Sequence, residues 1–136
     1  MTPIGKRGAI LGVMLLVVSA GEALATDNIT CTAPDYDTSL SFLVGTTPGL
    51  RPLSLSMESK GKKWSTAAET GVTPILVAQS FSDDEGMKID VTDGNAEAII
   101  AKLRVSYAHE EGTEGIFSGT LHIVGLGAWP VTCLGE

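Results

Sequence analysis

The chain has 136 residues, and its 16 acidic side chains outnumber its 9 lysines and arginines, giving a formal net charge of −7. Affinity for nucleic acid comes largely from Lys and Arg side chains that neutralise phosphates. A chain this acidic is therefore poorly suited to nucleic acid, and it is an equally poor match for an anionic membrane surface. We exclude both as expected partners.

The N-terminal segment has the three parts of a secretory signal peptide. Lys6 and Arg7 supply a positive start, residues 9–20 form an apolar run, and residues 23–25 read Ala-Leu-Ala, an A-x-A cleavage site. The apolar run is shorter than the roughly 20 residues that a membrane-spanning helix needs, which favours cleavage over an uncleaved anchor. We predict a signal peptide over residues 1–25, no stable membrane anchor after cleavage, and a periplasmic or secreted protein.

Removal of this leader leaves 111 residues with 7 basic and 15 acidic side chains, a net charge of −8. That length suits one domain with its own hydrophobic core. Residues 26–136 are therefore predicted to form a single domain. Its acidity would suit a basic partner, but it is equally a simple solubility feature.

The chain has two cysteines, Cys31 and Cys133. In an oxidising compartment the simplest arrangement is one disulfide. The bond requires the two Cα atoms to approach within about 7 Å, so the first and last elements of the domain are expected to be neighbours. No C-x-x-C motif is present, which argues against a redox-active pair.

Apolar and polar residues alternate with a period of two along most of the domain, which is typical of half-buried β-strands. The clearest runs are residues 39–44, 53–58, 74–81, 87–92 and 117–123. The alternation predicts that Leu53, Val77 and Phe81 face the core together with their neighbours in phase.

Residues 95–108 are ambiguous. Asn95 fits a helix N-cap, with Ile99 and Leu103 on one helical face. As a strand, the same segment points Ile99, Leu103 and Tyr107 inward. The Asp-Gly pair before it favours a hairpin, and we predict a strand.

Turn signals separate neighbouring runs by two to five residues, a spacing typical of hairpins. The prediction is an all-β, antiparallel meander of eight or nine strands. Because the disulfide brings the terminal strands together, a small closed barrel is favoured, with a β-sandwich as the alternative. A barrel of about eight strands is either filled by side chains or holds one small ligand.

No residues point to catalysis, a cofactor or a metal. His122 lies at an outward position and His109 in an acidic turn, and neither has an evident nucleophile or orienting partner. The acidic turns around Asp84 and Asp93 contain the oxygen ligands that Ca²⁺ uses. Their spacing does not match an EF-hand, and Asp and Gly are also what tight turns require.

The segment of residues 60–64 carries Lys60, Lys62 and Lys63 next to Trp64 on an otherwise acidic chain. It predicts a hairpin tip that presents positive charge and an aromatic anchor to a partner. The alternative is a solvated turn followed by a core tryptophan.

This loop resembles the Ser-Gly-x-x-Tyr loop of membrane-bound c-type lysozyme inhibitors, which are small periplasmic β-barrels with a terminal disulfide. The resemblance covers Ser59, Gly61 and Trp64, with Lys60 as an extra residue and Trp in place of Tyr. The Trp-x-x-Gly element that follows in those proteins is lacking here. The resemblance therefore stands as an analogy of architecture.

Three functions remain open. The first is a non-catalytic protein-interaction or inhibitor-type module that acts through Lys60, Lys62, Lys63 and Trp64. The second is a carrier of a small apolar ligand, with a barrel interior lined by residues such as Phe42, Leu55, Phe81, Leu103 and Phe117. The third is a structural protein of the cell envelope. The scarcity of histidine and the lack of a motif count against an enzyme.

Overall fold

A computed structural model describes residues 27–135, which form nine strands and no helix. The strands are β1 (Asp27–Thr32), β2 (Thr38–Val44), β3 (Pro52–Ser59), β4 (Lys62–Ser65), β5 (Thr73–Asp83), β6 (Gly86–Asp93), β7 (Ile99–Ala108), β8 (Ile116–Ile123) and β9 (Gly127–Gly135). The predicted signal peptide of residues 1–25 lies outside this range. Within the range, no helix has the length and apolar character needed to cross a membrane.

The nine strands follow one another in chain order around a closed barrel. The predicted all-β barrel is therefore confirmed. The prediction of a purely antiparallel meander is wrong at one place, because β4 and β5 pair in parallel through Trp64 with Thr73 and Ser65 with Pro74. The reason is that β4 is followed by residues 66–72, a loop long enough to carry the chain back before β5 begins.

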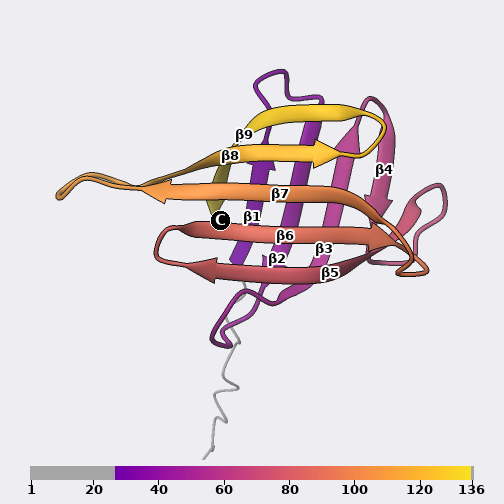
Figure 1. The fold of residues 1–136 in the computed structure, drawn as a ribbon, viewed down its shortest axis with the longest axis horizontal. Helices are drawn as coiled ribbons and strands as arrows, with labels where there is room; N and C mark the ends of the chain where they lie inside the picture. Colours follow the sequence, from indigo (N-terminus) through magenta and orange to yellow (C-terminus); the bar gives the residue numbers. More distant parts are fainter. Residues whose placement is uncertain (1–26, 136) are drawn as a thin grey trace, which may run out of the picture.

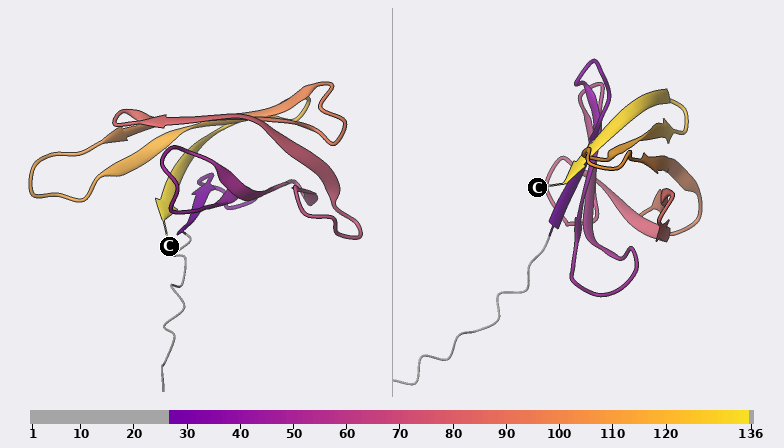
Figure 2. Two further views of the ribbon diagram at one scale, coloured as in Figure 1. Left: turned by 90° about the horizontal axis from the view of Figure 1, so that it is seen from below. Right: turned by 90° about the vertical axis from the view of Figure 1, so that its left-hand side faces the viewer.

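The barrel is flattened into two layers whose strands cross at a steep angle (Figure 1). Strands β5 to β9 form one layer, here called the front sheet, and β1 to β4 form the back sheet behind it. Figure 2 shows the two layers edge-on, with the β7–β8 hairpin extending beyond the body of the barrel. Crossed sheets of this kind bury the inward side chains of both layers between them.

The two ends of the described chain meet where β9 pairs with β1. Cys31 and Cys133 face each other in the register of that pair and form a disulfide. The prediction of a bond joining the terminal strands is thus confirmed. The bond is compatible with an oxidising periplasmic or extracellular location.

The core consists of one cluster of inward side chains from both sheets. Leu40 of the back sheet and Ile89, Leu103 and Leu121 of the front sheet are 0% exposed. These positions follow the predicted alternation, since each has a polar or exposed neighbour on either side. Burial of these aliphatic side chains is the main source of stability, at roughly 25 cal/mol per Å² of apolar surface removed from water.

The prediction that Phe81 faces the core is wrong. The pairing of β5 with β6 shifts between Val77 and Gln79, so Ala78 is an extra residue in β5. A bulge of one residue reverses which side chains point inward. Ile75 before the bulge is 1% exposed, whereas Phe81 after it is 57% exposed.

A second bulge explains the exposure of Leu53. The β2–β3 register passes from Ser54 directly to Pro52, and Leu53 is left out of the ladder and 62% exposed. A third shift lies opposite the start of β7, where Ile99 is 42% exposed and Ile100 packs against the core instead. The inward prediction was wrong for Leu53 and Ile99 for the same reason.

The ambiguous segment of residues 95–108 is a strand from Ile99 onward, and the strand prediction is confirmed there. Residues 95–98 belong to the turn between β6 and β7. The backbone N–H of Asp93 donates to the carbonyl of Ala98 at 3.0 Å and closes that turn.

Candidate functional site

The predicted interaction loop is a tight hairpin between β3 and β4. Lys60 and Gly61 have φ angles of 50° and 77°. Two consecutive residues with positive φ are typical of a type I′ turn, whose twist matches that of the strands it joins. Ser59 pairs with Lys62 on either side of this turn, so the tip is held by the ladder itself.

The three lysines of this hairpin are all exposed, as predicted. Trp64 is not part of the tip, because it is half-buried and packs against the core cluster. The alternative of a solvated turn followed by a core tryptophan therefore describes Trp64 correctly. Lys60 leans back over the ring of Trp129 on β9, with Nζ 5.7 Å from the ring centroid, and this cation–π contact ties the tip to the barrel.

A groove of about 450 Å³ lies beside the hairpin, on the outer face of the back sheet. Its floor contains a row of hydroxyl side chains in register across three strands, Ser41, Ser56 and Ser65. Thr30 on β1 continues this row beyond the groove, because it pairs with Ser41. Because side chains alternate along a strand, this row faces away from the core side chains of the same strands. The groove is therefore lined by groups that both donate and accept hydrogen bonds.

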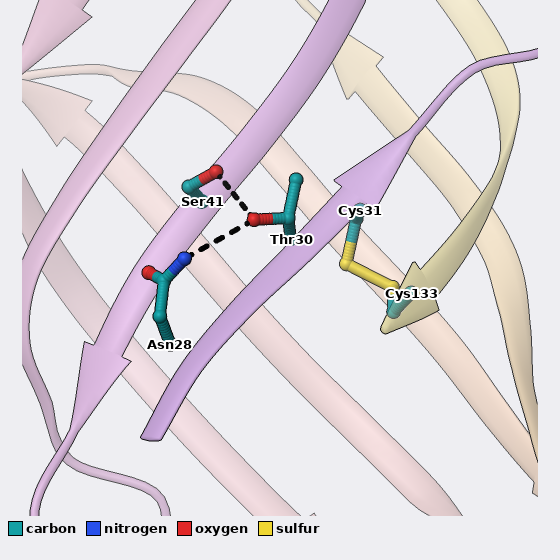
Figure 3. The surroundings of a disulfide bond; sticks show 5 residues. All are labelled: Asn28, Thr30, Cys31, Ser41 and Cys133. Carbon is teal, nitrogen blue, oxygen red and sulfur yellow. Dashed lines mark hydrogen bonds between the residues drawn. A yellow bond between two sulfur atoms is a disulfide. The ribbon is translucent and has the colours of Figure 1, made fainter. Parts of the chain in front are cut away.

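Figure 3 shows how the hydroxyls at one end of the row are held. The hydroxyl oxygens of Thr30 and Ser41 are 2.9 Å apart, and the Asn28 Nδ2 donates to Thr30 Oγ1 at 3.3 Å. Cys31 points to the opposite face of β1, toward its partner Cys133. These two hydrogen bonds fix the orientation of the Thr30 and Ser41 hydroxyls at this end of the row.

The groove has a charged end where it meets the hairpin. Lys63 and Glu58 are register partners on β4 and β3, and both line the groove. Glu69 and Val72 line the side formed by the loop of residues 66–72. The site thus joins an exposed lysine, two carboxylates and a floor of hydroxyls.

The groove is not among the sites predicted from the sequence, although two of the serines that form its floor lie in predicted strands. Ser41 and Ser56 occupy the outward positions of predicted strands, where alternation with core residues is enough to account for a polar side chain. What was absent from the sequence was the register of β2 against β3, which puts Ser41 and Ser56 side by side. The parallel pairing of β4 with β5 was also not predicted, and with it the loop of residues 66–72 that lines one side of the groove.

Of the five residues predicted to line a ligand-holding interior, four belong to the core or pack against it and one lies outside. Phe42, Leu55 and Leu103 are at most 2% exposed within the core cluster, and Phe117 is half-buried against it. Phe81 lies on the outside of the barrel.

The two histidines lie apart in the fold. His122 is exposed on the outer face of β8, as its phase predicts. His109 follows β7 in the protruding hairpin, where its ring stacks on Tyr107 at 5.3 Å between centroids. Tyr107 in turn stacks on Phe117 at 4.4 Å.

The acidic turns use their carboxylates to hold the backbone. Asp83 Oδ1 accepts the N–H groups of Glu85 at 2.8 Å and Gly86 at 3.1 Å. Asp93 Oδ1 accepts the N–H groups of Asn95 and Glu97. These bonds match the turn chemistry that the sequence favoured over calcium binding.

Similarity to known proteins adds nothing to this picture. No protein-family model matches the chain, and neither a curated protein nor a solved structure is found that matches it.

Ser59, one of the three residues of the resemblance to lysozyme inhibitors, is 0% exposed and bonded to the Thr38 hydroxyl at 2.9 Å. Ser59 therefore has a structural role in this barrel.

Proposed function

We propose that this protein is an exported, non-catalytic binding module that engages a partner protein through the β3–β4 hairpin and the adjoining groove. The observation that carries the proposal is the exposure of Lys60, Lys62 and Lys63 on a rigid hairpin at the end of a hydroxyl-lined groove. These lysines are three of the seven basic residues that follow the predicted leader. Positive charge is therefore concentrated at one tip of an acidic molecule.

The arrangement suits an extended partner segment that is acidic where it meets the lysine tip and neutral where it enters the groove, because Glu58 and Glu69 line the groove. Carboxylates of the partner would pair with Lys62 and Lys63, whose side chains are exposed. Polar groups of the same segment would bond with the hydroxyls of the groove floor, since Ser and Thr serve as donors and acceptors. Because the turn is already formed, little backbone conformational entropy is lost on binding.

The test is capture of partners from an envelope extract by the oxidised protein, with bound proteins identified by mass spectrometry. Lys62→Glu with Lys63→Glu reverses the charge of the tip and is expected to abolish capture. The melting temperature should fall only slightly, because both side chains are exposed and the new carboxylate at position 63 faces Glu58 across the strand pair. Arg51→Glu with Lys88→Glu is the matched control. It makes the same change in net charge at two exposed positions that do not line the groove.

The outcomes separate cleanly. Loss of capture in the hairpin variant alone supports the proposal. Equal loss in both variants would indicate an effect of net charge only, and unchanged capture in the hairpin variant would contradict a role for this tip.

A further inference from the structure

The turn between β1 and β2, at the top of Figure 1, holds a tyrosine in a backbone conformation that costs stability. Tyr36 has a φ angle of 60°, in the left-handed region that bulky side chains rarely adopt. The side chain is also 83% exposed, so burial of the ring does not compensate for this cost. Backbone strain of this kind is concentrated at sites that bind or act on ligands.

The base of this turn is firmly held. The N–H of Ala33 donates to the carbonyl of Thr38 at 2.9 Å, and the N–H of Tyr36 donates to the carbonyl of Ala33 at 3.0 Å. Ala33 and Thr38 are both buried, and the Thr38 hydroxyl lies 2.9 Å from the Ser59 hydroxyl on β3. The exposed ring of Tyr36 is therefore carried on an ordered support, which reduces the entropy that a ligand contact would cost.

A pocket of about 480 Å³ lies beside Tyr36, on the outer face of the sheet where β1 meets β9. Its lining combines three threonines with three apolar side chains. The threonines are Thr30, Thr32 and Thr132, and the apolar side chains are Pro34, Tyr36 and Leu134. Thr32 and Thr132 are register partners, so their side chains are neighbours on the outer face. A volume of this size is typical of small-molecule sites.

The lining defines the chemistry of a ligand. Among residues 27–135, no charged side chain lines this pocket, so a charged ligand would lose hydration without gaining an opposite charge. The threonine hydroxyls can donate and accept hydrogen bonds, and Thr30 keeps an unused site although it bonds Asn28 and Ser41. Tyr36 and Leu134 offer apolar surface beside these hydroxyls. A matching ligand is uncharged and has both an apolar face and hydroxyl groups around its edge.

We propose that this pocket binds a neutral saccharide, with a sugar ring stacked on Tyr36 and sugar hydroxyls bonded to Thr32 and Thr132. A sugar ring has the required form, because its C–H groups gather on one face while its hydroxyls project from the edge. A purely apolar ligand would instead cover the threonine hydroxyls without bonding them. The hydroxyl row continues from Thr30 to Ser41, which offers further contacts to a chain of several sugars.

This site is separate from the proposed protein interface. The pocket shares no lining residue with the groove beside the β3–β4 hairpin. The saccharide proposal therefore does not rest on the partner proposed for the lysine tip, and either can fail without the other.

The experiment is titration of the oxidised protein with three neutral hexasaccharides, cellohexaose, maltohexaose and chitohexaose, followed by backbone amide chemical shifts. We expect at least one of them to bind in the micromolar to millimolar range and to shift the amides of residues 30–36 and 132–134. Two charged hexasaccharides, hexagalacturonate and the deacetylated form of chitohexaose, are expected to bind more weakly.

Tyr36→Asn tests the role of the ring. Asn adopts the left-handed conformation more readily than Tyr, so this variant is expected to keep or raise the melting temperature. Saccharide binding should weaken by at least about tenfold, because the stacking surface is lost. Phe81→Asn is the matched control, since Phe81 is 57% exposed and lies on β5, away from the pocket.

Thr132→Val distinguishes a saccharide from an apolar ligand. Valine keeps the branched shape and removes the hydroxyl, so saccharide binding should weaken by about threefold to tenfold. Binding of N-phenyl-1-naphthylamine, an uncharged apolar dye, should not weaken. The proposal is overturned if none of the neutral hexasaccharides binds, or if a charged hexasaccharide or the dye binds more tightly than all of them. Equal losses in Tyr36→Asn and Phe81→Asn also overturn it.

Discussion

The two places where the front and back sheets join are built very differently. Between β1 and β9, four residue pairs and the Cys31–Cys133 disulfide hold the strands together. Between β4 and β5, two parallel pairs form the whole ladder, and β4 itself has four residues. The first join, here called the closed seam, is secured by a covalent bond. The second, the open seam, depends on packing.

This difference shows that closure of a barrel does not distribute stability evenly around it. The β4–β5 ladder ends at Ser65 and Pro74, and no strand of the described chain pairs with the rest of β5 on the side away from β6. Parallel pairing is also slightly less stable per residue than antiparallel pairing. We therefore expect local opening to begin at β4 and β5, while the closed seam opens only with the whole domain.

Removal of the disulfide has the largest expected effect. Cys31→Ala with Cys133→Ala, or reduction of the bond, frees a loop of 102 residue steps and is expected to lower the free energy of unfolding by about 2–5 kcal/mol. Urea unfolding with and without reductant measures the change. In the double-alanine variant, reductant should have no further effect. If reduction leaves the free energy of unfolding unchanged, the disulfide does not stabilise the closed seam, and the proposed difference between the two seams is wrong.

Leu50→Ala tests the packing of the open seam. Leu50 belongs to the loop between β2 and β3, is 9% exposed within the core cluster, and its carbonyl accepts a hydrogen bond from the Ser80 hydroxyl of β5. Truncation leaves a cavity where the ladder is missing. We expect a loss of about 2 kcal/mol, the lower end of the range for Leu→Ala, because this side of the barrel has most freedom to collapse.

Amide hydrogen exchange separates local from global effects of Leu50→Ala. Exchange in β4 and β5 should accelerate more than exchange in β8, which pairs on both sides. Uniform acceleration throughout the barrel would contradict the idea that the open seam is a separate, weaker unit.

The contrast between the seams also marks what the sequence could predict. Alternation of apolar and polar residues identified the strands, and two distant cysteines identified the closed seam. Neither signal reports the length of a ladder. The open seam depends on the bulge at Ala78 and on the return loop of residues 66–72, and both are set by tertiary packing. The same bulge explains why Phe81, in phase with core residues by sequence, faces outward.

One part of the candidate site could be predicted from the sequence and the other could not. Lys60, Lys62 and Lys63 were identified because charge on a turn is visible in the sequence. The groove beside them depends on which serines become neighbours across strands, and an error of one residue in register would turn them to the other face. A site that depends on register is therefore harder to predict than a site on a single turn.

A smaller effect is expected from strain in the turns. Gly61→Ala and Gly125→Ala place a Cβ at φ angles of 77° and 81°, with no heavy atom within 4 Å of either Cβ. Each is expected to cost about 1 kcal/mol, because the left-handed conformation disfavours a side chain. Gly61 adjoins the short strand β4, whereas Gly125 adjoins β9 of the closed seam.

The two glycine variants should therefore agree in chemical denaturation and differ in amide exchange. In Gly61→Ala, exchange in β4 accelerates beyond the global change, since a four-residue strand has few other bonds to hold it. In Gly125→Ala, exchange in β9 follows the global change, because the disulfide holds that strand. Identical exchange patterns in the two variants would contradict the claim that the open seam is locally less stable than the closed seam.

The smallest effect concerns the cation–π contact between the β3–β4 tip and β9. Lys60→Gln removes the cation over the Trp129 ring and is expected to destabilise the protein by about 0.5 kcal/mol, typical of an exposed cation–π pair. Lys62→Gln removes the same charge two residues away and serves as the control. Thermal unfolding and the fluorescence of Trp129, measured in a Trp64→Phe background, report the change.

A drop in stability with Lys60→Gln alone would mean that the tip is fixed by the barrel. The tip would then already be ordered in the free protein, so binding a partner would cost less conformational entropy. Equal behaviour of the two variants would mean that the tip is held by its I′ turn alone. In that case all three lysines, and not only Lys62 and Lys63, are free to contact a partner.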